Sequence, residues 1–463
     1  MKTFDRDIVS GSVYRSVWKL TWPVTLLNLI NGAHGFVHQI LIGHFVVAEH
    51  NAANAAVGMA WQVFLVVVVF IASLFHGMNV LIARYAGRQD RENLSRVAFH
   101  AFLASVYILV FIMAPLGYLL APHLLRFVET PPDVYPHALP YLRIMFTCGA
   151  PLFLMFMFTG AFQASGEPKT PLKLGILSTI LNIIISSVLI TGAGPFPHLG
   201  TVGAALGTVL AATVSVSIAI GLILRRRMII LPPSQFTLIP DLSILKVITR
   251  IGVPTGIQGV LLNVGGVFLL RFIGTLENAA AALAAYTICY SQLFNLVSWV
   301  SFGLRSAAGT VMGQNIGAGD PRRGKHGVAI AALLGGVWAA FIGLFFWAVP
   351  IELLGLFGAV EGPVRAYGTS LLHYLSLSGI FLATALALTG GLQGAGETKL
   401  PMYIAFLTQI VILLGICSYY QGMGALTTER VWMAILISHG SRLLLTWLVF
   451  RTEKWAHTVV EID

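Results

Sequence analysis

The sequence predicts an all-α polytopic membrane protein of about twelve transmembrane helices, arranged as two six-helix lobes related by a parallel internal repeat. Apolar residues make up 57% of the chain and charged residues 10%, against roughly a quarter charged in soluble domains. The charged residues are confined to short segments between long apolar runs. In addition, one short motif recurs 230 positions further along the chain.

The uncharged runs are long enough to cross a bilayer. No Asp, Glu, Lys or Arg occurs within residues 20–48, 50–83, 97–125 or 174–224. A spanning helix needs ~20 apolar residues, because hydrocarbon offers no partner to backbone polar groups. With Pro, Gly and charged residues as boundaries, we expect spans to begin near residues 16, 52, 97, 138, 171, 200, 244, 279, 326, 366, 400 and 431.

The distribution of Lys and Arg predicts the orientation in the membrane. If the N-terminus is cytoplasmic, 21 of the 28 Lys and Arg residues fall in inside segments and four in outside segments. We therefore expect both termini in the cytoplasm. This topology explains the net charge of +10 without nucleic-acid binding. Residues 1–19 lack the short apolar core and cleavage site of a removed signal peptide.

The repeat is the strongest evidence for two halves. Residues 159–171 read TGAFQASGEPKTP and residues 389–401 read TGGLQGAGETKLP. The identical pairs are Thr159/Thr389, Gly160/Gly390, Gln163/Gln393, Gly166/Gly396, Glu167/Glu397, Lys169/Lys399 and Pro171/Pro401. Nearby offsets recover Pro23/Pro254, Gly43/Gly274, Gly87/Gly317 and Asp90/Asp320. We expect an N-terminal lobe at 1–230, a C-terminal lobe at 231–463 and a cytoplasmic linker at 228–243.

An even number of spans in each half makes both halves enter the membrane from the same side, which is a parallel repeat with the substrate path between the halves. The repeated motif closes one helix with a glycine and opens the next with a proline. We interpret it as a structural turn on the cytoplasmic side. A gating ion pair between its Glu and Lys is the alternative.

Several stretches together resemble one known family. They are Trp22-Pro23, Leu181-Asn182-Ile183, Leu199-Gly200 with Gly203-Ala204-Ala205, Ala284-Ala285-Tyr286, Val311 to Asp320, and Leu392 to Pro401. In this order and spacing the chain is similar to bacterial multidrug and toxic compound extrusion (MATE) transporters. The resemblance implies export of organic, often cationic, compounds in exchange for Na⁺ or H⁺, with a coupling site in the N-terminal lobe.

At that coupling site the sequence departs from the family pattern. His38 stands where the family has an aspartate in the first span, and Ser186 ends an Asn182-x-x-x-Ser motif that elsewhere ends in Asp. The C-terminal lobe offers Gln258 and Asn263 instead of the carboxylate of some branches. Intramembrane carboxylates are the usual ligands of coupling ions. We therefore expect proton coupling rather than sodium coupling.

Histidine is the remaining group that titrates near neutral pH. His34 and His38 share one helix face because they are four residues apart, and His76 in the second span could approach them. The first hypothesis is that His38 exchanges a proton during transport. The alternative is that these residues are hydrogen-bonded polar groups in a wet cavity. Half of a metal site is disfavoured because no third ligand is placed.

Positively charged residues lie inside the predicted spans. Arg305 and Arg442 sit deep, and His439 shares a helix face with Arg442. Such residues face the protein interior and mark a structural pair or a substrate path. A cavity with positive and no negative charge repels cations, so one hypothesis is a preference for neutral or anionic amphiphiles.

The predicted function is secondary active efflux of amphiphilic drugs or metabolites by alternating access. The alternative is a flippase for a lipid-linked, pyrophosphate-bearing precursor. No catalytic charge set or phosphate loop indicates an enzyme, and Cys148, Cys289 and Cys417 lack the paired spacing of a metal or disulfide framework. We expect no cofactor beyond the coupling ion, no metal and no nucleic acid, with the bilayer and a small molecule as partners of a monomer in the inner membrane.

Overall fold

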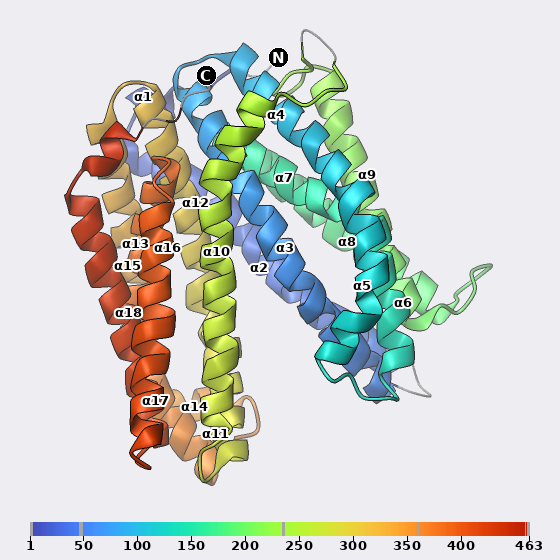
Figure 1. The fold of residues 1–463 in the computed structure, drawn as a ribbon, viewed down its shortest axis with the longest axis vertical. Coiled ribbons are helices and arrows are strands. Elements are labelled where there is room, and N and C mark those ends of the chain that lie inside the picture. The colour runs from blue at the N-terminus through green and yellow to red at the C-terminus, as the bar shows by residue number, and fades with distance from the viewer. Residues whose placement is uncertain (1–2, 46–49, 234–236, 360, 459, 461–463) are drawn as a thin grey trace. The chain divides into compact units, whose positions relative to one another are not determined.

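The computed structural model describes residues 3–45, 50–233, 237–359, 361–458 and 460, and throughout them the chain is helical without strands (Figure 1). The side chains of residues 31–45, 50–54, 65–66, 69–74 and 457 lie outside the described part. Helices are the expected solution in a bilayer, because each satisfies its own backbone hydrogen bonds.

The helices follow one another with short connections. Up to residue 224 they are α1 (Asp7–Ser10), α2 (Val13–Phe45), α3 (His50–Gly87), α4 (Arg91–Tyr107), the π-helical η1 (Ile108–Met113), α5 (Ala114–Phe127), α6 (Tyr135–Cys148), α7 (Ala150–Ala164), α8 (Lys169–Thr191) and α9 (Gly200–Leu224). From residue 242 they are α10 (Leu242–Ile273), α11 (Ala279–Tyr286), the π-helical η2 (Thr287–Leu293), α12 (Asn295–Gly317), α13 (Pro321–Ala348), α14 (Pro350–Gly355), α15 (Pro363–Gly394), α16 (Lys399–Ala405), the π-helical η3 (Phe406–Leu414), α17 (Gly415–Gly422), α18 (Thr428–Arg451) and the 3₁₀ turn η4 (Lys454–His457).

The predicted all-α membrane fold is confirmed. Nine described helical runs are long and apolar enough to span a membrane, or ten if α6 and α7, bent by 54°, form one span. Helices α2 and α3, with 33 and 38 residues, are also long enough to cross. Together these make up the twelve predicted spans. The start positions also agree, and the largest offset is at α4, which begins at Arg91 rather than near 97.

Two compact units divide the chain. Unit 1 contains residues 26–252, and unit 2 contains residues 5–25 and 253–460. The chain therefore passes from one unit to the other inside α2 and inside α10, close to Pro23 and Pro254. Each proline removes one backbone donor from its helix. The predicted division into 1–230 and 231–463 with a linker at 228–243 rests on the sequence repeat and stays a prediction.

Small residues bring helices close together within each unit. In unit 2, a Cβ on Gly394 of α15 would lie 2.6 Å from the Cα of Gly309 in α12. In unit 1, a Cβ on Gly203 of α9 would lie 2.7 Å from the Leu189 backbone in α8. Between membrane helices no water is released, so such close contact between backbones supplies much of the packing attraction.

Candidate functional site

A chain of polar side chains crosses the interior of unit 2. Arg305 of α12 donates from Nε (3.1 Å) and Nη2 (2.7 Å) to Oε1 of Gln393 in α15. The Gln393 amide in turn donates from Nε2 to Oε1 of Gln258 in α10, at 2.8 Å. Gln393 and Gln258 are 0% and 2% exposed, whereas Arg305 is only half-buried. The two amides therefore hold a guanidinium that solvent or a ligand can still reach.

The donors and acceptors on each side chain fix the direction of these hydrogen bonds. A guanidinium carries only donors, so the amide of Gln393 must turn its oxygen toward Arg305 and its NH₂ group toward Gln258. The partner of Arg305 among these side chains, Gln393, is neutral, so the positive charge of Arg305 is not cancelled. Polar groups buried in this way are stable only when their hydrogen bonds are made.

A second buried arginine lies nearby on α18. Arg442 is 4% exposed and His439, one turn earlier, is 3% exposed. Arg442 is close enough to Arg305, His439 and Tyr290 to interact with each electrostatically. Nη2 of Arg442 and Nδ1 of His439 have no hydrogen-bond partner among the described residues. An unsatisfied buried charged group is costly, and it requires an explanation.

Aromatic rings stack beside His439. Tyr286, Tyr290 and Phe294 follow each other at four-residue spacing, with centroids 4.9 and 5.3 Å apart. The π-helical segment η2 lies between the first and the last of them. His439 stacks on Phe294 with centroids 6.2 Å apart and planes 5° from parallel, and Trp432 stacks on Tyr286 at 6.3 Å.

No carboxylate balances these charges in the described part of unit 2. Asp7, Glu277, Glu352 and Glu361 are exposed. The others contact groups elsewhere: Asp5 pairs with Lys19, Asp320 caps α13, Glu397 caps α16, Glu429 accepts from Ser370, and Glu453 pairs with Lys325. Among all described carboxylates only Glu167 is buried, and it lies in a loop of unit 1. The interior of unit 2 is therefore cationic.

Known proteins identify the family. A family profile described as MatE matches residues 23–188 and 254–417, which is most of the chain in two copies. The chain belongs to the MatE family. The predicted resemblance is thus confirmed, and a profile described as Lipid II flippase MurJ matches the smaller range 138–300.

Relatives of this MatE chain agree along nearly their full length. It is 26% identical over 400 residues to "Probable multidrug resistance protein YoeA" of Bacillus subtilis, covering 85% of this chain and 84% of that one. It is 24% identical over 454 residues to "Probable multidrug resistance protein NorM" of Thermotoga maritima, covering 97% and 94%. A crystal structure of a MATE protein in the bent conformation has the same fold, with a TM-score of 0.86, 21% identity and 98% of each chain covered.

In unit 1 of this MatE chain, two of the positions expected to carry coupling, Asn182 and Ser186, are neutral and packed. Asn182 is 3% exposed and donates from Nδ2 to Oγ1 of Thr208, at 2.9 Å. Ser186 is 0% exposed and lies against Gly207, whose Cβ, if present, would be 2.8 Å from the Ser186 backbone. A packed amide and hydroxyl offer neutral oxygens and no titratable group.

The other residues predicted for the coupling site or substrate cavity do not all lie at one place in the structure. Asn263 is exposed and donates to the Gly259 carbonyl of its own helix at 2.9 Å, so it does not join Gln258 in the polar chain. His76 lies in α3 and is partly buried. The side chains of His34 and His38 lie outside the described residues. The contact between Arg305 and Gln393 was not foreseen, since no spacing rule links residues 88 positions apart.

The two repeated loops have the same backbone and different side-chain partners. Gly166 and Gly396 both adopt left-handed φ values, 92° and 88°, and the next N–H bonds five residues back in each. Glu167 accepts from the Ile229 N–H (3.3 Å), whereas Glu397 accepts from the N–H groups of Lys399 and Leu400 (3.0 Å each). Gln163 is buried in α7, Lys169 and Lys399 are exposed, and Pro171 and Pro401 are buried in the helices that follow.

The predicted linker folds back onto α4 of unit 1. The Leu231 N–H donates to Oγ of Ser95 at 2.9 Å, and Arg96 pairs with Asp241 at 2.5 Å. Partial burial raises the pKa of the Asp241 carboxyl, but hydrogen bonds from Arg96, Ser243 and Ile244 outweigh this and hold the pKa below its usual 3.8. His100 Nδ1 accepts from the Asp241 N–H at 3.1 Å. These contacts tie Leu231 and Asp241 to one helix.

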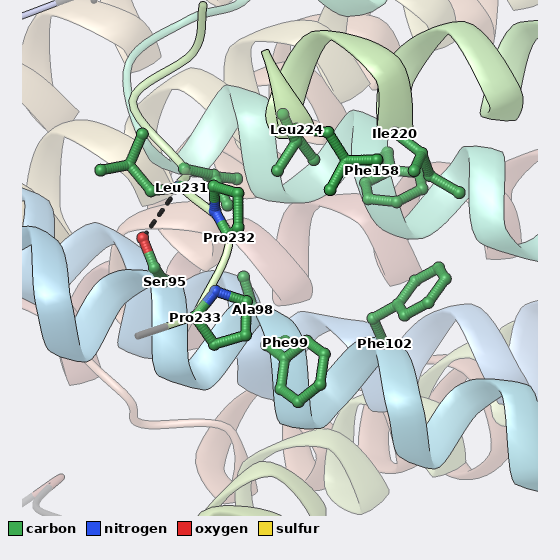
Figure 2. A pocket seen from close by; sticks show the side chains of 12 residues that line it. Ser95, Ala98, Phe99, Phe102, Phe158, Ile220, Leu224, Leu231, Pro232 and Pro233 are labelled. Carbon is green, nitrogen blue, oxygen red and sulfur yellow. Dashed lines mark hydrogen bonds between the residues drawn. The ribbon is translucent and has the colours of Figure 1, made fainter. Parts of the chain in front are cut away.

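An apolar pocket of about 220 Å³ lies beneath this linker. Figure 2 shows Phe99, Phe102 and Phe158 facing it, with Pro232 and Pro233 of the linker at its edge. Ligand pockets for drug-sized molecules usually measure roughly 300–1,000 Å³ and include a few polar groups that orient the ligand. This pocket is smaller and nearly without polar groups, so it offers little that would orient a ligand.

Proposed function

We propose that this chain is a secondary active efflux transporter that exports amphiphilic small molecules by alternating access, as a proton antiporter. It acts in the bacterial inner membrane, with both termini in the cytoplasm, as a monomer whose partners are its substrate and the surrounding lipid. Membership of the MatE family and the multidrug-resistance names of its relatives support the class. The proposed transport cycle uses no cofactor and no covalent reaction.

The polar and aromatic cluster of unit 2 carries the proposal. Charged side chains inside a membrane bundle are expensive and are kept where they face a substrate path. Arg305 and Arg442 are such residues, and buried, stacked aromatic rings make their surroundings apolar. The passage of the chain between the units inside two helices, each near a proline, also suits a protein whose units must change their arrangement.

Proton coupling is the finer part of the proposal. Sodium is held by oxygen ligands, commonly with carboxylates, and the corresponding positions of unit 1 hold Asn182 and Ser186. Histidine is the group that titrates in the working range of pH. We assign the proton exchange to His38 with His34, and keep His76 as an assisting candidate.

Reconstituted vesicles test this function. We expect an acidic lumen to drive dye uptake, because protons leaving the vesicle exchange for dye entering it, and an imposed Na⁺ gradient to have no effect. His38→Ala should abolish the pH-driven uptake, whereas His198→Ala, in an exposed loop, should retain it. Uptake driven only by Na⁺ would contradict proton coupling, and unchanged uptake by His38→Ala would remove that residue from the mechanism.

A flippase for a lipid-linked precursor is the second candidate function, favoured by the match of residues 138–300 to the MurJ profile. A deletion strain separates the two functions. We expect greater sensitivity to amphiphilic drugs without accumulation of a lipid-linked precursor. Accumulation of the precursor at normal drug sensitivity would favour the flippase.

A further inference from the structure

We propose that Arg305, Arg442 and His439 form a binding site inside unit 2 for the anionic group of a hydrophobic organic anion, such as an aromatic carboxylate or sulfonate. As a statement about transported compounds, the inference rests on the proposed efflux function. As a statement about binding, it stands on the interior of unit 2 alone.

Uncompensated charge is the first argument. Arginine stays protonated in proteins, so Arg305 and Arg442 bring two positive charges into the interior of a membrane bundle. The bonds of Arg305 go to the neutral amide of Gln393. Every described carboxylate of unit 2 is either exposed or engaged elsewhere. Two such charges repel one another, and an anion between them removes the repulsion.

Free donors are the second argument. Nη2 of Arg442 and Nδ1 of His439 are buried and lack partners in the part of the chain that the structure describes. Both residues are more than nine-tenths buried. A guanidinium presents its donors in a planar fork that matches the two oxygens of a carboxylate, or two of the three of a sulfonate. The tautomer of His439 with a proton on Nδ1 adds one more donor.

Preorganisation is the third argument. Gln258 orients Gln393, and Gln393 holds the Nε and Nη2 edge of Arg305. A positive group whose direction is set before the ligand arrives loses little freedom on binding. Arg305 is the half-buried member of the cluster, so it is the one that an entering anion meets first.

The apolar surroundings of the cluster are the fourth argument. Tyr286, Tyr290 and Phe294 stack on one another beside His439, and Tyr286 and Phe294 are only 6% and 1% exposed. Packed rings keep water away from the positive groups, which therefore stay poorly solvated without a counter-charge. The site therefore suits an anionic group on an apolar body, and it repels a cation of the same shape.

A matched pair of dyes tests the proposal. Fluorescein and rhodamine 123 share a xanthene ring system and carry opposite charges. We measure their binding by fluorescence polarisation to the full chain in nanodiscs of pure phosphatidylcholine, without any gradient. The expected result is fluorescein binding about tenfold or more tighter than rhodamine 123. Equal binding of the two dyes, or tighter binding of rhodamine 123, would overturn the site.

Substitutions locate the binding. Arg305→Gln and Arg442→Gln should each weaken fluorescein binding about tenfold, and Arg451→Gln, an exposed position at the end of the same α18, should not. Equal losses in Arg442→Gln and Arg451→Gln would contradict the assignment. If a variant does not fold, the wild-type protein still tests the site. Fluorescein should raise its melting temperature, and rhodamine 123 should not.

The anionic group could belong to a free compound or to an anionic phospholipid. Nanodiscs that contain phosphatidylglycerol separate these sources. Competition with fluorescein in the wild type identifies a phospholipid headgroup, and unchanged affinity identifies a free organic anion. Because binding needs no gradient, fluorescein binding without any vesicle transport would refute only the efflux function. Gradient-driven transport of cationic dyes without fluorescein binding would refute only this site.

Discussion

At three pairs of positions 230 residues apart, the two units carry opposite chemistry. In unit 1 they are buried and apolar, and in unit 2 they are cationic or titratable. The pairs are Phe75/Arg305, Val209/His439 and Ala212/Arg442. At the same offset Gln163 and Gln393 are identical and both buried. The repeat therefore supplied both units with one helical scaffold, and at these three pairs of positions unit 2 carries the charged or titratable residue.

The same contrast exists where two helices cross. In unit 2, Gly394 meets the backbone of Gly309, which leaves no room for a side chain. In unit 1, the corresponding positions are Ala164 and Asn79, and a Cβ on Gly160 would lie 2.5 Å from Nδ2 of Asn79. A side chain therefore fills the crossing in unit 1, and direct backbone contact fills it in unit 2.

The largest effect is expected when the charge of unit 2 is placed in unit 1. Ala212→Arg puts a guanidinium at a position that is 1% exposed, and we expect it to lower the free energy of unfolding by about 3 kcal/mol or more, because the charge has no partner there. Thermal unfolding in detergent, followed by size-exclusion fluorescence, measures the loss. Leu224→Arg, at the 64% exposed end of the same helix, is the control. Equal stability of the two variants would show that unit 1 accepts a cation as well.

The next effect concerns the helix crossing in unit 2. Gly394→Ala forces a methyl group against the Gly309 backbone, and we expect a loss of about 2 kcal/mol from overpacking. Gly415→Ala, where a Cβ would meet nothing within 4 Å, should be neutral or slightly stabilising. If the two variants melt at the same temperature, backbone contact does not hold α12 against α15.

A smaller effect of opposite sign is expected at the binding site. Arg442→Leu removes a buried charge with an unpaired Nη2 atom, and we expect the ligand-free protein to gain about 1 kcal/mol. Fluorescein should no longer raise its melting temperature. Arg451→Leu, which is exposed, should change stability by less than about 0.5 kcal/mol. A clear loss of stability in Arg442→Leu would instead identify Arg442 as a structural partner within the unit.

The smallest effect concerns a repeated turn that ends α3 in unit 1 and α12 in unit 2. Gln89 adopts φ 58° and its counterpart Gly319 adopts φ 85°, both left-handed. Gln89→Gly should therefore stabilise unit 1 by about 0.5 kcal/mol, and Gly319→Ala should destabilise unit 2 by about 1 kcal/mol. Paired melting curves compare the two. If the two substitutions shifted the melting temperature in the same direction, left-handed backbone strain would not explain the stability of both turns.

Much of the fold follows from the sequence alone, because a bilayer leaves the chain few choices. Uncharged runs of at least ~20 residues must become helices in hydrocarbon, and the observed helix starts lie close to the predicted ones. The repeated turns were equally readable, since Gly166 and Gly396 stand where a left-handed residue ends a helix. Local geometry and the solvent decide such features.

The candidate site depends on contacts that no local pattern encodes. Gln163 and Gln393 are the same residue in the same motif, but the motif does not reveal that Gln393 accepts from Arg305, because that contact forms only when α12 packs against α15. Likewise Glu167 accepts from the linker and Glu397 from the next helix. Asn263 seemed equivalent to Gln258 by position in its span, but α10 turns it outward. Side-chain partners were decided by which helices pack together, and that is a property of the tertiary structure.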